Sequence, residues 1–276
     1  MNVQKKHVHS CADKEGIKQM KAFTNRYELK YVIDWPTYIF IRKEIKLLFK
    51  KDKSAGKSGK YDVMSIYYDT PGLDFFWQKI DGEEERTKLR LRTYVHTPHI
   101  EKQDIFLELK KKKNQNVFKK RIPIAEKITE NIKITENVKK TREFLHAPWN
   151  KEFIKEDQLQ GEEIQNEMEC LGTLLHLHPT IVISYTREPF VSADNLSTRI
   201  TFDSNVRYRS NNFSLTVSPM DKHVLSPSHV IMEIKYIDHF PRWLVYIIQK
   251  YKCQARTFSK YCIGMEQFLK EQNACF

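Results

Sequence analysis

Three cationic side chains, Lys88, Arg90 and Arg92, occupy every second position of one short segment. Successive side chains of an extended strand point to opposite faces, so these three share one face and the leucines between them share the other. A guanidinium group offers a planar pair of donors to carboxylate or phosphate oxygens, and an ammonium group acts as a compact point charge. The segment therefore predicts a strand whose polar face binds anionic oxygens.

Three further segments place a glutamate and a lysine on one strand face, with an apolar residue between them. They are Glu28–Lys30, Glu108–Lys110 and Glu233–Lys235. A chain this rich in Glu and Lys produces about three such triplets by chance, so their β-like context carries the argument rather than their number. Any one of these strands alone could present an exposed face of alternating charge. The four strands together favour one shared charged lining.

Two more segments extend the same alternation. After Lys110 the sequence predicts a hairpin whose return strand places Lys119 and Arg121 on one face. Further on, Arg199 and Asp203 fall on one side of a strand with an apolar opposite side. The predicted strands therefore carry acids among an excess of cations.

Composition limits the class of protein and of partner. The chain has 276 residues and a net charge of +12, from 47 Lys plus Arg against 35 Asp plus Glu. An anionic partner is expected, and nucleic acid, anionic lipid and polyphosphorylated small molecules all fit. The 5 cysteines include no Cys-x-x-Cys pair, which argues against a disulfide framework or a zinc site. The apolar runs are too short for a membrane span or a signal peptide, so we expect a soluble cytoplasmic protein.

The order of elements predicts one domain. Residues 1–21 are polar and basic and predict a disordered leader, whereas 22–272 predict a single domain with a helical insertion at about 124–179. Helices are expected over 38–49, 163–177, 243–251 and from Ser259 to about Lys270, and 73–80 predicts a strand or a short helix; these ranges follow from apolar periodicity and capping residues.

The connections between the strands indicate the fold class. Short strands separated by turns, without regular strand–helix alternation, favour an α+β fold with an antiparallel sheet and appended helices. If about eight strands close on themselves, the interior is wide enough for side chains or one slim ligand. We therefore expect a closed antiparallel β-barrel that forms a tunnel, with helices packed outside and the cationic faces inside.

Eight motifs, taken in order, match those of a known family. They are Arg26–Tyr31, Ser65–Thr70, Lys88–Tyr94, Leu107–Lys110, Tyr185–Glu188, Thr198–Asp203, Met232–Tyr236 and Ser259–Tyr261. Together they resemble the VTC domain, the polyphosphate polymerase of the vacuolar transporter chaperone complex, within the triphosphate tunnel metalloenzyme (CYTH-like) superfamily. Each motif alone is weak, and the ordered set, which spans nearly all of residues 22–268, is specific.

The resemblance implies a tunnel open at both ends that binds triphosphate together with Mn²⁺ or Mg²⁺. The catalytic cations that it implies are Arg90, Arg92, Lys235 and Lys260. Further phosphate-binding cations are Lys30, Lys110, Lys119, Arg187 and Arg199. The metal-binding glutamate is Glu233, with Glu28, Glu108 and Asp203 as further acidic candidates.

The expected activity is transfer of the terminal phosphate of ATP to a growing inorganic polyphosphate chain, with release of ADP. One alternative is a tunnel triphosphatase that hydrolyses inorganic or nucleoside triphosphate. A second is a non-catalytic polyanion-binding module; nucleic acid is disfavoured as its ligand because glutamates share faces with the lysines. The sequence shows neither an SPX domain nor membrane helices, so a soluble, bacterial-type polymerase is expected, which leaves a membrane partner and the oligomeric state open.

Overall fold

The computed structural model describes most of the chain. The described residues are 26–95, 104–114, 116–124, 143–154, 161–192, 198–216 and 218–274. The predicted leader, 1–21, lies outside them, as does much of the predicted insertion, so the predicted domain limits stay a prediction.

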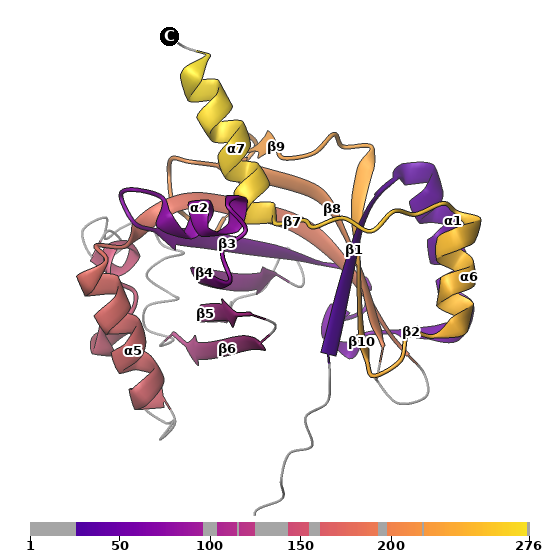
Figure 1. The fold of residues 1–276 in the computed structure, drawn as a ribbon, viewed down its shortest axis with the longest axis horizontal. Coiled ribbons are helices and arrows are strands. Elements are labelled where there is room, and N and C mark those ends of the chain that lie inside the picture. Colours follow the sequence, from indigo (N-terminus) through magenta and orange to yellow (C-terminus); the bar gives the residue numbers. More distant parts are fainter. Residues whose placement is uncertain are drawn as a thin grey trace, which may run out of the picture.

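One antiparallel sheet organises the fold (Figure 1). Its strands are β1 (Arg26–Asp34), β2 (Phe49–Lys51), β3 (Tyr61–Asp69), β4 (Glu85–Val95), β5 (Ile105–Lys113), β6 (Asn116–Pro123), β7 (His178–Ser192), β8 (Arg199–Arg209), β9 (Lys222–His223) and β10 (His229–Ile237). The strand order is β1-β10-β8-β7-β3-β4-β5-β6, with β2 paired to β7 and β9 paired to β8. The α+β class and the antiparallel sheet agree with the sequence prediction.

The sheet is strongly curved but is not a closed barrel. Within the described residues, β1 and β6 are the two ends of the strand order and share no pairing. In Figure 1 the strands β4, β5 and β6 lie apart from β1 and β10. In a closed barrel, β6 would have to form backbone hydrogen bonds with β1. Strand β6 is instead an edge strand rich in charged side chains, and such side chains disfavour pairing with a further strand. The expectation of a closed barrel is therefore not confirmed.

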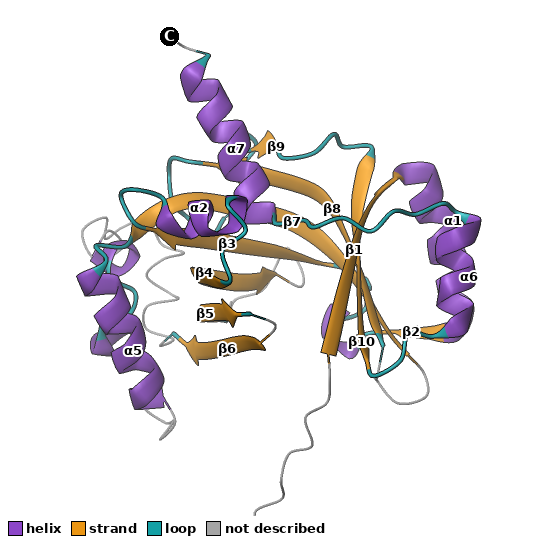
Figure 2. Cartoon of the chain, viewed as in Figure 1, coloured by secondary structure: helices purple, strands orange, loops and turns teal. Residues whose placement is uncertain are grey.

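Helices pack against both faces of the sheet (Figure 2). They are α1 (Trp35–Leu48), α2 (Asp74–Ile80), α5 (Gly161–Leu174), α6 (Arg242–Lys250) and α7 (Lys260–Asn273), with the short 3-10 helices η1 (Lys53–Ala55) and η2 (Lys151–Phe153). The predicted helices are all present, and α2 shows that the 73–80 segment is a helix. Asp34 caps α1 by accepting a hydrogen bond from the backbone N–H of Thr37 at 2.8 Å. No helix in the described part of the chain is long and apolar enough to cross a membrane.

The core lies mostly on the convex side of the sheet. Leu89, Leu91 and Leu107 belong to a buried cluster that α5 covers through Met168. A second buried cluster lies under α1 and α6. These clusters contain the apolar residues that alternate with the charged ones, so burying them turns the charged side chains toward the concave face.

The first turns of α7 cover part of the concave face itself. Gly264 lies so close to Ile183 that an added Cβ would clash with its Cδ1 atom, and the ring of Tyr261 stacks on that of Tyr67 at 4.9 Å. Helix α7 therefore closes the apolar part of this face and leaves the charged part open.

Candidate functional site

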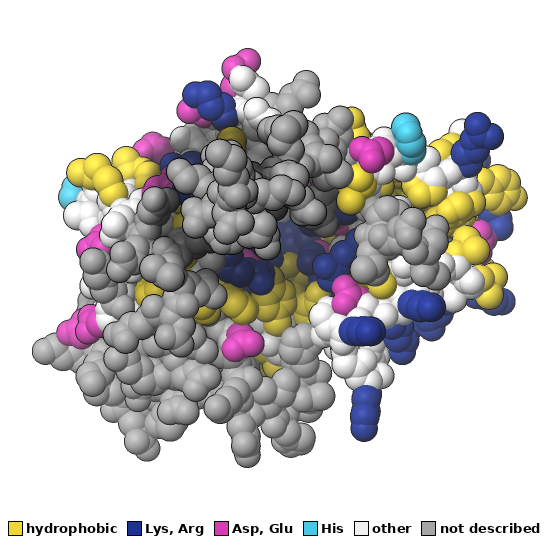
Figure 3. Space-filling view, turned by 90° about the horizontal axis from the view of Figure 1, so that it is seen from below, with side chains coloured by type: hydrophobic (Ala, Val, Ile, Leu, Met, Phe, Trp, Pro, Cys, Tyr) yellow, Lys and Arg dark blue, Asp and Glu magenta, His cyan; other side chains and the backbone are white. Residues whose placement is uncertain are grey.

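The concave face gathers charged side chains from most of the sheet. Figure 3 shows a hollow with Lys and Arg side chains inside it. Strand alternation and register place these residues on that face: Glu28 and Lys30 of β1, Lys88, Arg90 and Arg92 of β4, Glu108 and Lys110 of β5, Lys119 and Arg121 of β6, Arg187 of β7, Arg199 and Asp203 of β8, and Glu233 and Lys235 of β10.

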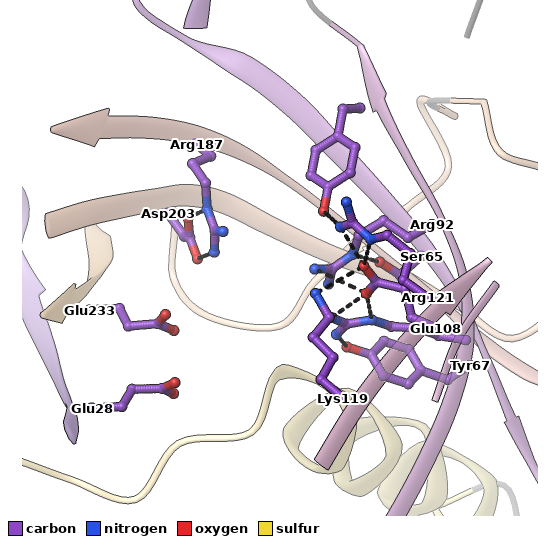
Figure 4. A network of polar contacts seen from close by, with 12 residues as sticks. Glu28, Ser65, Tyr67, Arg92, Glu108, Lys119, Arg121, Arg187, Asp203 and Glu233 are labelled. Atoms are coloured by element: carbon purple, nitrogen blue, oxygen red, sulfur yellow. Dashed lines mark hydrogen bonds and ion pairs between the residues drawn. The ribbon is translucent and has the colours of Figure 1, made fainter. Parts of the chain in front are cut away.

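Buried Glu108 is surrounded by four cations (Figure 4). Arg90 donates from Nε and Nη2 to Oε2 of Glu108 at 2.9 and 2.7 Å. Arg121 donates from Nε to Oε1 at 2.7 Å, and Nζ of Lys119 lies 3.1 Å from the same oxygen. Arg92 Nη1 lies 3.8 Å from Oε2. One carboxylate therefore fixes the positions of four positive groups and neutralises only one of them.

The environment of this cluster lowers the pKa of Glu108 and of Lys119. Burial by itself would raise the pKa of Glu108, but the positive charges of Arg90, Arg92 and the two β6 cations outweigh it and hold the pKa well below its usual range. Burial lowers the pKa of Lys119. The carboxylate therefore stays ionised at any physiological pH, and the cluster keeps its net positive charge.

Tyr67 adds a titratable phenol to the same wall. Its Oη accepts a hydrogen bond from Nη1 of Arg90 at 2.9 Å. Burial would raise the pKa of Tyr67, but the charges of Arg90, Arg92 and Lys88 outweigh it and lower the pKa to about 7. The phenolate form is therefore accessible near neutral pH, where it stabilises the neighbouring cations.

Across the hollow, β1 and β10 carry two pairs of opposite charges. Lys30 Nζ lies 2.7 Å from Glu28 and 3.8 Å from Glu233, and Lys235 Nζ lies 2.7 Å from Glu233 and 3.5 Å from Glu28. The strand register explains this arrangement of four alternating charges, because Glu28 is opposite Lys235 and Lys30 is opposite Glu233. Figure 4 shows both carboxylates pointing toward the space in front of the Glu108 cluster.

Opposite charges on β1 and β10 also shift the pKa of Glu233 and of Lys30. Burial would raise the pKa of Glu233, but Lys235 and Lys30 outweigh it and hold the pKa well below its usual range. Burial would lower the pKa of Lys30, but Glu233 and Glu28 raise it above its usual value. Glu233 and Lys30 are therefore both charged at neutral pH.

A fourth acid, Asp203, lies fully buried on β8. Arg187 donates from Nε and Nη2 to its two oxygens at 2.7 and 2.8 Å. Lys260, at the first position of α7, places Nζ 2.6 Å from Oδ2 and lies over the ring of Tyr185. This contact brings a residue from the end of the chain onto the concave face.

A cavity of about 460 Å³ opens at one end of the charged face. Its lining includes the cations Lys30, Arg86, Lys88, Lys110 and Arg256. Burial lowers the pKa of Lys88 and of Lys110, and neither forms an ion pair with any residue that the structure describes. Such lysines gain most from a bound anion, because a negative charge would offset the cost of burying them.

The structure places all the predicted site residues on the concave face, with one at its margin. Arg199 lies opposite Lys235 in the register, but its Nη2 lies 2.9 Å from Oδ2 of Asp52, in the loop before η1. Its buried Nε has no hydrogen-bond partner in the described structure. Arg199 is therefore held partly by a loop rather than by the acids of the sheet.

Three residues of the site were not among the predicted site residues. Strand alternation had already placed Lys88 and Arg121 on the same faces as predicted cations, but neither residue had been assigned a role. Tyr67 gave no such signal, since its role depends on the register that sets it opposite Arg90.

The acids differ in their suitability for a metal. Arginines donate short hydrogen bonds to both oxygens of Glu108 and of Asp203. Glu28 and Glu233 each have one oxygen 2.7 Å from a lysine, and their other oxygens lie 3.5 and 3.8 Å from the nearest ammonium group. Glu28 and Glu233 face the same space, and Mg²⁺ is commonly bound by one or two carboxylates together with substrate phosphates. Within the described residues, no group of three or more His, Cys, Asp and Glu side chains is arranged to hold a metal ion. The Glu28–Glu233 pair therefore fits an ion that shares its coordination with phosphate.

The model of the VTC domain family matches residues 25–269. The chain belongs to the VTC domain family. Membership of this family implies an enzyme that acts on phosphates, with nucleotides or polyphosphate as the substrate class.

Other comparisons of this VTC domain gave distant likenesses. A candidate adenylate cyclase from Bacillus halodurans has 9% identity and a TM-score of 0.44, over 84% of this chain and 92% of that chain. A candidate adenylyl cyclase from Hippeastrum, HpAC1, with a dominant triphosphatase activity, has 10% identity and a TM-score of 0.48, over 87% of this chain and 96% of that chain. The comparison of this chain with curated proteins found no match.

Proposed function

We propose that this VTC domain is a polyphosphate polymerase that transfers the terminal phosphate of ATP to the end of an inorganic polyphosphate chain. One observation carries the proposal: cations from seven strands and from α7 converge on one concave face, held in place by a few buried acids. Such a face complements a string of phosphates better than a single small anion.

The chemistry needs little covalent help from the protein. Phosphoryl transfer is accelerated mainly by in-line positioning and by stabilisation of charge on the transferring group. The cations of an empty site repel one another, and each additional phosphate reduces that repulsion. A phosphate oxygen of the growing chain is itself the attacking group, so no protein nucleophile is required.

The proposed roles divide the site residues into three sets. Arg90, Arg92, Lys235 and Lys260 would contact the reacting phosphates. Lys30, Lys110, Lys119, Arg187 and Arg199 would hold the rest of the chain. Glu108 and Asp203 remain predicted metal ligands, although their ion pairs favour a role as counter-ions that orient the arginines.

Glu233 and Glu28 would hold a divalent cation, Mn²⁺ or Mg²⁺. Such an ion offsets negative charge on phosphate oxygens and orients them. In this arrangement Lys30 and Lys235 would turn from the two carboxylates toward phosphate, since both lysines already border the hollow.

The test is an analysis of the products formed from ATP with Mn²⁺ or Mg²⁺. A ladder of polyphosphate on a gel, with ADP released in equal amount to phosphate incorporated, is expected. Release of orthophosphate without a ladder would instead identify a tunnel triphosphatase. Arg90→Ala and Lys235→Ala should abolish synthesis while the sheet stays folded by circular dichroism, and wild-type rates in both variants would refute the assigned roles.

A further inference from the structure

Helices α1 and α6 lie side by side on the convex side of the sheet (Figure 1), and both expose apolar side chains. Leu47 is 83% exposed, Tyr246 63%, Phe40 55% and Ile39 50%. Both helices already bury another face in the core, so these residues are additional to the packing that the fold requires. An apolar patch of this kind on a soluble surface commonly marks an interaction site.

The two helices form one continuous surface. The ring of Phe40 stacks on that of Tyr251 at 6.3 Å, and Phe49 contacts Trp243 edge-on at 5.3 Å. Lys250 of α6 donates to Glu44 of α1 at 2.6 Å. The exposed apolar residues of both helices therefore lie on one rigid surface rather than on independent segments.

Basic side chains lie among the apolar ones. On α1 the exposed lysines are Lys43 and Lys46, and Arg242 is exposed on α6. Glu44 is the single acidic residue in the two helices, and it is held by Lys250 and by Tyr251 Oη at 2.6 Å. Figure 3 shows hydrophobic and basic side chains next to one another at the end of the molecule that carries these helices. The surface is therefore apolar and positive.

This combination selects among the partners that an apolar surface could have. A second copy of the same surface would bring positive charge against positive charge, which disfavours a symmetric dimer. An anionic lipid bilayer offers both an apolar layer and negative headgroups. Helices that lie in the membrane interface carry aromatic and aliphatic residues beside lysines and arginines.

We propose that the α1–α6 surface docks the domain onto an anionic lipid bilayer as a peripheral protein. Phe40, Leu47 and Tyr246 enter the interfacial region, and Lys43, Lys46 and Arg242 contact lipid phosphates and carboxylates. Because these helices lie on the convex side of β1 and β10, docking leaves the concave face open to its substrates.

The test is co-sedimentation of the full chain with vesicles of phosphatidylcholine alone or with one quarter phosphatidylserine. Binding to the serine-containing vesicles is expected, with little binding to phosphatidylcholine and a loss at high salt. The variants Phe40→Ser/Leu47→Ser and Lys43→Glu/Lys46→Glu should each reduce the bound fraction roughly tenfold or more. All four positions are exposed, so the fold is expected to survive, and circular dichroism checks this.

A matched control changes exposed apolar residues elsewhere. Leu174 at the end of α5 is 71% exposed and Met220 is 85% exposed. Leu174→Ser/Met220→Ser should bind vesicles as the wild type does. Equal binding to both vesicle types, no binding by the wild type, or wild-type binding by either surface variant would overturn the proposal. A wild-type dimer that Phe40→Ser/Leu47→Ser converts to a monomer would also overturn it and would assign the surface to a second copy.

Discussion

Replacement of Glu108 by Gln tests whether this carboxylate is the anchor of the site's cations. The change keeps the shape of the side chain and removes the charge that Arg90, Arg92, Lys119 and Arg121 share. At an effective dielectric constant of about 20, unit charges about 4 Å apart attract by about 4 kcal/mol, and desolvation cancels part of this. Removing one partner of a buried pair costs about 3–5 kcal/mol, because the other charge stays buried without compensation.

The expected loss is measurable by thermal unfolding. For a chain of this size, 1 kcal/mol corresponds to about 2–4 °C, so the Tm of Glu108→Gln should fall by roughly 10 °C. Inorganic tripolyphosphate should raise the Tm of the variant more than that of the wild type. Without the Glu108 charge the site has one more uncompensated positive charge, so tripolyphosphate should bind it more tightly. A ligand that binds the folded state raises the stability more, the more tightly it binds.

Glu85→Gln is the matched control. Glu85 forms an ion pair with Lys113 across the same two strands, β4 and β5, but both side chains are largely exposed. Exposed pairs contribute little, so this variant should unfold at nearly the wild-type temperature. If Glu108→Gln lowers the Tm no further than Glu85→Gln, or if tripolyphosphate stabilises it less than the wild type, the view of Glu108 as the anchor is wrong.

Three other changes test separate parts of the structure. The pKa of Tyr67 is about 7 in the folded protein and about 10 in the unfolded chain, so between these pH values the unfolded chain binds more protons. The free energy of unfolding of the wild type, measured by urea titration, should therefore rise with pH relative to that of Tyr67→Phe. The expected rise is on the order of 1 kcal/mol per pH unit between pH 7 and 10. Glu233→Gln should weaken Mn²⁺ binding in the presence of tripolyphosphate by calorimetry, and unchanged affinity would remove it from the proposed metal site. An added methyl group in Gly172→Ala would overlap the ring of Trp149, so the Tm should fall while tripolyphosphate affinity, measured by calorimetry, stays the same.

Much of the secondary structure could be predicted from local patterns. Apolar periodicity predicted a helix over 38–49, and the structure extends its start to Trp35, where Asp34 caps α1. The 73–80 segment was ambiguous because its short apolar run fits either a strand or a helix. In the structure it is helix α2, and the backbone N–H groups of Phe75 and Phe76 in that helix donate to the Asp69 carboxylate. Such ambiguity is resolved by contacts that the segment makes outside itself.

Sheet closure could not be predicted in the same way. The number of strands was nearly right, but whether the last strand pairs with the first depends on twist and curvature added over the whole sheet. The described sheet stops at β6, so the open shape is a property of the assembled strands.

Local sequence was enough to show which side chains share a face, because the alternation of a strand is fixed by the backbone geometry of neighbouring residues. That is why Arg90 and Arg92, or Glu233 and Lys235, could be grouped before any fold was known. Which opposite charges pair with one another became visible in the folded chain: Lys30 lies between Glu28 and Glu233, and Lys260 reaches Asp203. These pairings join residues far apart in the chain, and they depend on strand register and helix packing, which local backbone geometry does not specify.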